Sequence, residues 1–328
     1  MGLLRRRGGD GDAAGKLRIY YASDIHGTEV LWRKFLNAPK VYETPVIIMG
    51  GDVTGKVVVP LVDDGEGGVT AELFGQPARA ATEEERAELE HRIRSNGMYP
   101  HLMTPAEVER VAGLTIEERE AWFAEVMLHT FARWMALAEE RLTDDVRCFV
   151  MPGNDDPPGV DRAIEEAAKV EACDDRVVDF HGYTMLSLGY ANRTPFDSPR
   201  ELDEDELLRR IERMAEEVPD MSRAIFNLHV PPYASDLDTC PALDENLQVI
   251  LAAGQPKLAP AGSTAVREAI EKHQPMLALH GHIHESRGAT RIGRTLCINP
   301  GSDYHTGRIS GVLVHLKGDR ADYQFVVG

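Results

Sequence analysis

The chain has 328 residues, of which 43% are apolar and 27% are charged, and 54 acidic against 36 basic residues give a net charge of −18. This length corresponds to about two domains with a sizeable core, and the composition excludes a largely disordered chain. The acidic balance disfavours a protein that coats nucleic acid or an anionic membrane, because polyanions repel each other.

The N-terminal stretch and the cysteines indicate the cellular compartment of the protein. No apolar run approaches the ~20 residues that span a bilayer, and the arginines near the N-terminus have no apolar segment behind them that would form a signal peptide. We expect residues 1–16 to form a disordered tail. The cysteines at 148, 173, 240 and 297 form no CxxC pair, so a disulfide or thiolate framework is not expected. These features favour a cytoplasmic protein without a membrane partner.

The first two predicted strands each run into a polar turn. The apolar run at 17–22 leads into Asp24 and His26, and the run at 45–49 leads into Gly51 and Asp52. Length and aliphatic content indicate buried strands, and the glycines after them indicate sharp turns out of a sheet.

Residues 56–145 form a predicted insertion that is mainly helical. The segments 57–62 and 69–74 predict a β-hairpin. Three helices follow, each beginning with a capping box in which a Thr and an acidic residue three positions later satisfy free backbone N–H groups. These pairs are Thr82 with Glu85, Thr104 with Glu107, and Thr115 with Glu118.

The third helix of the insertion, about 116–141, carries an apolar stripe that includes Phe123, Phe131 and Trp134. Core packing accounts for such a stripe, and a role as lid or partner surface is the alternative. Because the insertion leaves the predicted sheet just past Asp52, we expect it to lie near the site, restrict access and favour small substrates.

Three further apolar runs end in polar turns, at 146–151, 223–228 and 275–279. Helices are predicted at 161–172, 201–218 and 262–273, a hairpin at 176–190 and a β-rich end at 290–328. The alternation of strands and helices predicts an α/β layered sandwich. The polar residues that follow the three runs are Asn154, Asp155, Asp156, His229, His282 and His284.

The five strand ends together indicate a metal centre, because ligands in open α/β sheets bind beyond the carboxyl ends of the strands. A lone DxH or GD is usually an ordinary turn, but five such ends in order are hard to obtain by accident. Crowded carboxylates and imidazoles would remain unsatisfied in a dry site, and two divalent cations would resolve that conflict. Imidazole, carboxylate and amide ligands suit Mn, Fe or Zn better than Ca or Mg.

At this point the sequence resembles the calcineurin-like metallophosphoesterase superfamily, whose pattern is D-x-H, G-D, G-N-H-[D/E], H and G-H-x-H. The resemblance covers residues 17–55 and 146–328. In these segments the sequence is similar to prokaryotic phosphoesterases described as Icc-like. The resemblance implies one domain over 17–328, built as an α/β/β/α sandwich and interrupted by the insertion. The matching residues are Asp24, His26, Asp52, Asn154, His229, His282 and His284.

The resemblance also implies a mechanism with two divalent metal ions. One metal would be held by Asp24, His26 and His284, and the other by Asn154, His229 and His282, with Asp52 bridging them. A hydroxide between metals roughly 3.5–4 Å apart would attack the phosphorus of a small phosphate-ester substrate.

The sequence departs from the family pattern at Asp155, where a His is usual. Asp155 is either a protonated general acid or a residue that orients its neighbours; His305 or His181 as proton donor is the less favoured alternative. Asp156 is expected to hydrogen-bond to backbone or to a ligand His. Arg193 and Arg287 could contact phosphate, and Tyr304 and His305 could line the cleft, although surface positions would explain them equally well.

The favoured function is a binuclear metal-dependent hydrolase of phosphate esters, with a phosphodiesterase preferred over a phosphomonoesterase or nucleotidase. A non-catalytic protein-binding scaffold is the alternative from another class, and the complete ligand set argues against it. A purple acid phosphatase-like enzyme is disfavoured because His26 is present and no Tyr follows Asp52. Long nucleic acid is not expected as a partner, since the sequence shows no basic track for an exonuclease.

Overall fold

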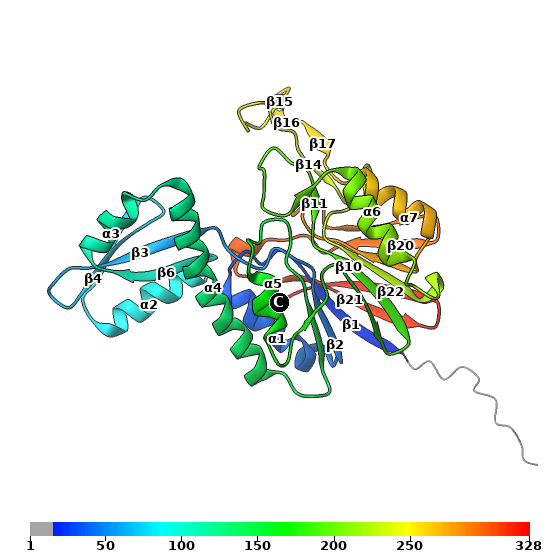
Figure 1. Cartoon of the computed structure of the whole chain (residues 1–328), viewed down its shortest axis with the longest axis horizontal. Helices are drawn as coiled ribbons and strands as arrows, with labels where there is room; N and C mark the ends of the chain where they lie inside the picture. Colours follow the sequence, from blue (N-terminus) through cyan, green and yellow to red (C-terminus); the bar gives the residue numbers. More distant parts are fainter. Residues whose placement is uncertain (1–15) are drawn as a thin grey trace, which may run out of the picture.

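The computed structural model describes residues 16–328, and two six-stranded sheets form its main body (Figure 1). The expected tail at 1–16 lies outside the described residues except for its last position. The first sheet has the order β22-β21-β1-β2-β7-β8, with parallel pairing from β1 to β8. Its strands are β1 (Leu17–Ala22), β2 (Val46–Met49), β7 (Arg147–Val150), β8 (Glu171–Ala172), β21 (Ser310–Lys317) and β22 (Arg320–Val327).

The second sheet has the order β19-β20-β18-β13-β10-β9, and its four inner strands run parallel. Its outer strands β9 and β19 pair antiparallel with their neighbours. The strands are β9 (Arg176–Phe180), β10 (Tyr183–Leu188), β13 (Ala224–Leu228), β18 (Leu277–Leu279), β19 (Gly288–Ile292) and β20 (Thr295–Asn299).

Helices cover the outer face of each sheet, so the layers are helix, sheet, sheet, helix. Successive side chains of a strand point to opposite faces: Ile19 packs between the sheets, while Tyr20 packs under the helices of the first sheet. This is the α/β/β/α sandwich predicted from the sequence. The first sheet is covered by α1 (Glu29–Tyr42), α4 (Ile116–Arg141) and α5 (Val160–Glu165), and the second by α6 (Glu204–Ala215) and α7 (Thr264–His273).

Residues 57–112 form a lobe that projects to one side of the body (Figure 1). The expected hairpin is present as β3 and β4, but the lobe also contains two strands that the sequence did not predict, and its sheet has the order β5-β4-β3-β6. All three capping boxes are formed. The lobe elements are β3 (Val57–Asp63), β4 (Val69–Leu73), β5 (Gln76–Ala80), α2 (Glu83–Arg94), β6 (Met98–Met103) and α3 (Pro105–Ala112).

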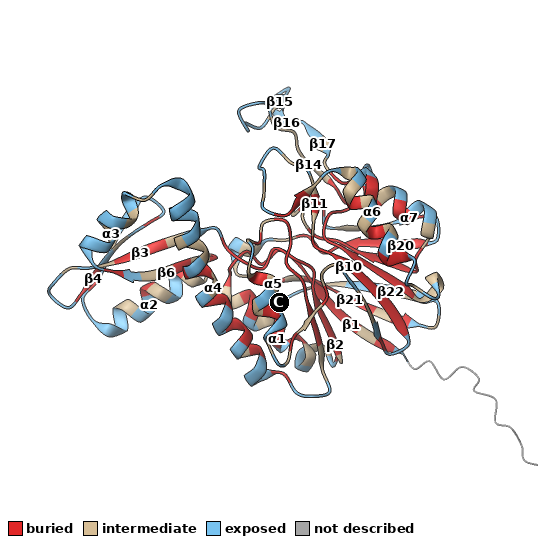
Figure 2. Cartoon of the chain, in the orientation of Figure 1, coloured by how far each residue is buried: buried red, intermediate tan, exposed pale blue. Residues whose placement is uncertain are grey.

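Helix α4 begins beside the lobe and ends in the core of the body. Phe131 and Trp134 are buried against α1 and the first sheet, so the apolar stripe serves core packing. Figure 2 shows the change along this helix, from exposed at its start to buried further on.

The helix predicted at 161–172 is shorter than expected. Only Val160–Glu165 is helical, and the chain then extends into β8, where Glu171 and Ala172 pair with Phe149 and Val150. Pairing with the edge of the first sheet satisfies the backbone of these residues and ends the helix, an effect that local sequence does not record.

Short elements complete the described chain. Within residues 16–328 no helix combines the length and the apolar character that crossing a membrane requires. The short elements are β11 (Ala191–Asn192), β12 (Glu201–Leu202), η1 (Met221–Arg223), β14 (Thr239–Pro241), β15 (Leu251–Ala252), β16 (Gln255–Pro256), β17 (Leu258–Pro260) and η2 (Tyr304–Thr306).

Candidate metal centre

The turns after β1, β2, β7, β13 and β18 meet at one edge of the sandwich. All seven residues that the sequence nominated as ligands come together there, and six of them are buried or nearly so. Only His284 keeps a substantial exposed fraction, 29% of its side chain.

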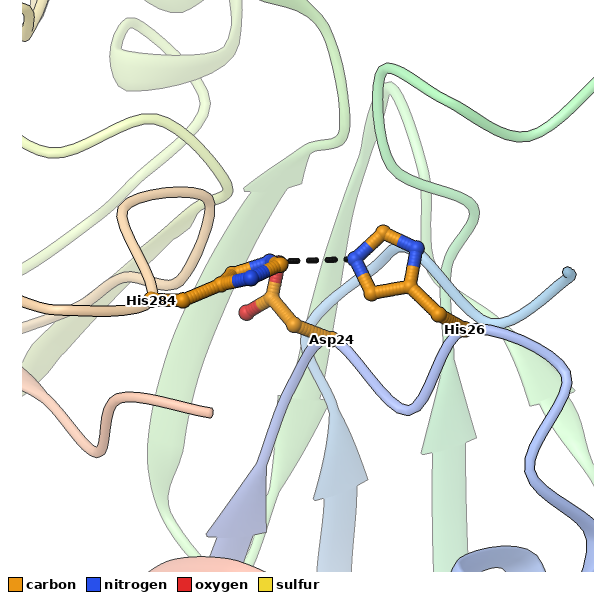
Figure 3. A group of neighbouring side chains, drawn as sticks. All are labelled: Asp24, His26 and His284. Atoms are coloured by element: carbon orange, nitrogen blue, oxygen red, sulfur yellow. Dashed lines mark hydrogen bonds and ion pairs between the residues drawn. The ribbon is translucent and has the colours of Figure 1, made fainter. Parts of the chain in front are cut away.

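The first group of side chains contains Asp24, His26 and His284 (Figure 3). Nε2 of His26 lies 3.0 Å from Nε2 of His284, and Nε2 of His284 lies 3.5 Å from Oδ1 of Asp24. One potential ligand atom from each residue falls within 4.8 Å of the others. These atoms point toward one another from the β1 turn and the β18 turn.

The second group contains Asp52, His229 and His282, whose ligand atoms also lie within 4.8 Å of one another. The Oδ1 atom of Asn154 joins them, at 3.1 Å from Nε2 of His229 and 2.7 Å from Nδ1 of His282. Oδ2 of Asp52 lies 3.4 Å from Nε2 of His229 and 3.7 Å from Nε2 of His26. Asp52 therefore lies between the two groups.

The backbone at the centre is strained. Asp24, His26, Asp52 and His282 have φ angles of 59°, 40°, 48° and 65°, in the left-handed region that residues with a Cβ seldom occupy. Such strain collects at functional sites, where the surrounding structure holds it. Here it turns each side chain inward directly after its strand.

Two glycines allow the turns to approach closely. A Cβ on Gly153 would lie 2.2 Å from Oδ1 of Asp52, and a Cβ on Gly281 would lie 2.3 Å from Oδ2 of Asp24. The glycines of the GN and GHxH motifs therefore make room for the carboxylates of the neighbouring turns.

Backbone contacts hold the ligand side chains in place. Nδ1 of His229 lies 2.8 Å from the carbonyl oxygen of Gly50, which leaves its Nε2 facing the cluster. Metal-binding histidines commonly donate their second ring nitrogen in this way. The buried carboxylate of Asp156 accepts from the N–H groups of Val53, Thr54 and Gly153 and from the Thr54 hydroxyl, so it ties the Asp52 turn to the Asn154 turn.

The electrostatics of the cluster call for a cation. Burial alone would raise the pKa of Asp52, but the imidazoles of His229 and His26 lower that pKa far below its usual value. Burial likewise opposes protonation of His229, yet Asp52 and Asp24 raise its pKa to about 10. Two buried carboxylates thus require positive charge beside them, and imidazole, carboxylate and amide donors together suit a transition-metal ion or zinc.

Asp155 has two partners that sequence reasoning missed. Its Oδ2 lies 2.5 Å from the ammonium of Lys56, and its Oδ1 accepts a hydrogen bond of 2.7 Å from the hydroxyl of Ser198. Both partners are donors to this carboxylate. Lys56 follows Asp52 in the same turn, which was the signal available in the sequence.

Other polar residues divide between the cluster and remote positions. The ring of Tyr304 lies 4.7 Å from that of His26, so it lines the cluster, whereas Arg193 pairs with Asp203 at 3.0 Å on the surface. His305 is 70% exposed and pairs with Asp303. His181 occupies the β9–β10 turn at the opposite end of the second sheet and is no candidate proton donor.

Comparisons with known proteins show similarity at the level of the fold. No family model matches the chain. It is 29% identical over 162 residues to an uncharacterized protein of Methanocaldococcus jannaschii; the match covers 48% of this chain and 66% of that protein, just under two thirds of its length. One crystal structure superimposes with a TM-score of 0.54 at 17% identity, covering 95% of this chain and 99% of the other. For the protein TT1561 of Thermus thermophilus the TM-score is 0.49 at 14% identity, with coverage of 94% and 99%.

Proposed function

We propose that this chain, which has the calcineurin-like metallophosphoesterase fold, is a metal-dependent hydrolase of phosphate esters with a binuclear centre. The observation that carries the proposal is the position of Asp52 between two groups of inward-facing ligands. A single ion would leave one of the two groups without a partner.

The ligand assignment follows the two groups. Asp24, His26 and His284 would hold one ion, while Asn154, His229 and His282 would hold the other, and Asp52 would reach both. Mn, Fe or Zn fits these donors. Bound divalent ions supply a nucleophile at neutral pH by lowering the pKa of water, and they neutralise charge on the phosphoryl oxygens.

Residues at the rim of the cluster would orient the substrate and supply positive charge. Asp155 accepts from Ser198 and holds the ammonium of Lys56 at the rim of the cluster, 2.5 Å from its own Oδ2. In this proposal Asp155 is a positioning residue rather than a protonated general acid. The Lys56 side chain is 61% exposed, which would let a phosphoryl oxygen reach its ammonium group.

We propose a small phosphodiester as the substrate class. The lobe contacts the Asp52 turn, since the N–H of Gly55 donates to the hydroxyl of Tyr99 on β6 at 2.6 Å. A lobe based so close to the cluster would hinder a long polymer more than a small ester. The described cysteines are unpaired, which fits the cytoplasm that we propose as the location.

Hydrolysis of bis(p-nitrophenyl) phosphate with added Mn²⁺ tests the proposal, with p-nitrophenyl phosphate measured in parallel. We expect turnover of the diester that exceeds turnover of the monoester, and about a 10³-fold loss in Asp52→Asn, because several kcal/mol of transition-state stabilisation would vanish. Faster turnover of the monoester would make the chain a phosphomonoesterase. Equal rates in the parent and Asp52→Asn, or none in either, would refute metal-dependent hydrolysis.

A further inference from the structure

A cavity of about 350 Å³ opens beside His284. Its wall includes Arg287, Ser302, Asp303 and Arg308. The volume lies within the roughly 300–1,000 Å³ range of small-molecule sites. Because His284 belongs to both the cavity wall and the Asp24 group, a substrate held at the cluster could extend directly into the cavity.

The cavity carries positive charge although the chain as a whole is acidic. Its lining includes two arginines, Arg287 and Arg308, and one carboxylate, of Asp303, which already lies 3.1 Å from His305. In the part of the chain that the structure describes, neither arginine forms an ion pair. Arg193 and Arg200, by contrast, are both paired with aspartates.

Packing rather than a counter-ion holds Arg287. Its guanidinium carbon lies 4.8 Å from the centre of the Phe325 ring, a cation–π contact that uses the face of the guanidinium and not its N–H groups. Among the described residues, the cavity therefore presents two exposed arginines without a carboxylate partner, one of which is held against an aromatic ring.

The cavity wall is also tied rigidly to the ligand turn. The buried amide of Asn299 donates to the carbonyl oxygens of Gly281 and Ile283 and accepts from the N–H of Gly301. Gly301 has a φ of 66°, and a Cβ there would lie 2.8 Å from Cβ of Arg287. Asn299 and Gly301 thus set the position of Arg287 relative to His282 and His284.

The geometry points to an anion-binding subsite, in which Arg287 and Arg308 bind a second phosphoryl group on the organic part of the substrate. The inference rests on the proposed function and narrows it to phosphate esters that carry a further phosphate. Guanidinium forks match phosphate oxygens with paired hydrogen bonds, and each such charged contact strengthens binding about tenfold or more. A neutral ester would occupy the cluster and leave this subsite empty.

Two matched substrates test the subsite: thymidine 5′-(p-nitrophenyl phosphate) and its 3′-phosphorylated derivative, which share the scissile bond and leaving group. With Mn²⁺ at fixed ionic strength, we expect the 3′-phosphate to raise kcat/KM about ten- to a hundredfold. Arg287→Gln, Arg308→Gln and the double variant should bring that ratio toward one. Arg291→Gln on β19, a surface arginine outside the cavity, should leave it unchanged.

Calorimetric binding of thymidine 3′,5′-bisphosphate and thymidine 5′-monophosphate separates the subsite from the proposed activity. Tighter binding of the bisphosphate that the double variant loses supports the subsite even if neither ester is hydrolysed, an outcome that would refute only the hydrolase. Hydrolysis of both esters at equal kcat/KM, with equal binding of the two nucleotides, would overturn the subsite and leave the hydrolase standing. A preference that survives in the double variant would also overturn it.

Discussion

The body and the lobe of this protein are built in different ways. The body buries its apolar side chains in three clusters around two sheets, whereas the lobe has one small cluster on a four-stranded sheet. Helix α3 in the lobe has no buried residue. Figure 2 shows the same contrast, with exposed helices around the lobe sheet and buried strands in the body.

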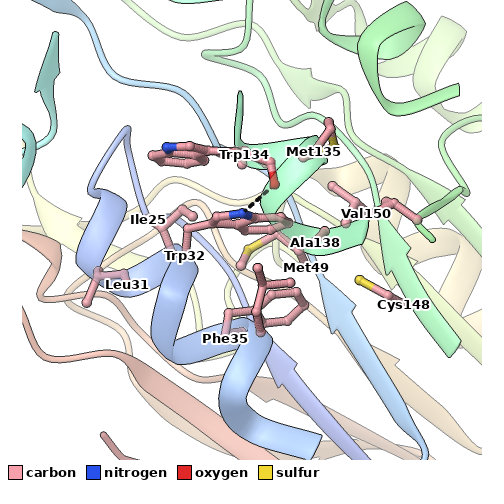
Figure 4. Close-up of a cluster of buried hydrophobic side chains, with 14 of the residues drawn as sticks. Ile25, Leu31, Trp32, Phe35, Met49, Trp134, Met135, Ala138, Cys148 and Val150 are labelled. Atoms are coloured by element: carbon pink, nitrogen blue, oxygen red, sulfur yellow. Dashed lines mark hydrogen bonds between the residues drawn. The ribbon is translucent and has the colours of Figure 1, made fainter. Parts of the chain in front are cut away.

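The candidate ligands thus lie in the well-buried part of the molecule. Every turn that carries a candidate ligand follows a buried strand of the body, while the lobe touches the cluster region at its base, where Tyr99 accepts from Gly55 and Gly97 packs against the backbone of His26. Helix α4 links the two regions, because its later half packs into the body. There the ring of Trp134 stacks on the ring of Trp32 with 5.8 Å between their centres, and the backbone carbonyl of Trp134 accepts a hydrogen bond from the indole N–H of Trp32 (Figure 4).

The largest effect on stability is expected at this stack. Replacing the buried side chain in Trp134→Ala removes apolar contacts and opens a cavity, which should lower the free energy of unfolding by about 3–5 kcal/mol. The matched control is Ile116→Ala at the exposed start of the same helix, which should change it by less than about 0.5 kcal/mol. Urea denaturation of both variants measures the difference, and equal effects would contradict the division of α4 between the two environments.

The next largest effect is expected on catalysis, at Lys56 on the rim of the metal centre. Lys56→Met should lower kcat/KM for a small diester about tenfold, because one charged contact worth ~1.5 kcal/mol is lost. Lys257→Met, in the exposed loop far along the chain, serves as the control and should keep the parent rate. If Lys56→Met retained full activity while Asp155→Asn did not, Asp155 would act by itself and not through Lys56.

Removing the lobe tests whether it restricts access. Residues 58–113 can be replaced by a short Gly-Ser linker that keeps α4, since α4 belongs to the core. We expect the body to remain folded and the preference for a small diester over an oligonucleotide to fall roughly tenfold, a change of about 1.4 kcal/mol.

Tyr99→Phe in the full chain is the matched control, because it removes only the hydroxyl that accepts from Gly55. An unchanged preference in a folded lobe deletion would show that the lobe does not restrict access. A loss of preference in Tyr99→Phe alone would assign the effect to that single contact.

The smallest effect lies within the lobe. Thr104→Ala breaks the capping box at the start of α3, which should cost about 1 kcal/mol of local stability. Hydrogen exchange should then speed up in α3 and leave β1 and β13 unchanged. Faster exchange throughout the body would mean that lobe and body unfold as one unit.

The residues that gather at the cluster could be picked out from the sequence because the relevant signals are local. Each candidate ligand follows an apolar run within a few residues, so the runs and the turns after them pointed to Asp24 and His229, and the family resemblance completed the set. The capping boxes were predictable for the same reason, since Thr104 and Glu107 satisfy each other within one helical turn.

The features that the sequence missed depend on contacts between distant segments. Strand β6 contains Pro100 and lacks clear alternation, and it becomes a strand by pairing in parallel with β3. Lys56 lies against Asp155, although about a hundred residues, the lobe among them, separate the two in the sequence. The cavity likewise joins Arg287 to Arg308 across two turns, and no spacing in the sequence indicates that contact.

Anomalous diffraction from a crystal grown with Mn²⁺ would locate the metal ions themselves. We predict two anomalous peaks roughly 3.5–4 Å apart, one within the Asp24, His26 and His284 group and one beside His229 and His282, with Asp52 between them. A single peak, or a peak away from Asp52, would contradict a binuclear centre bridged by that carboxylate.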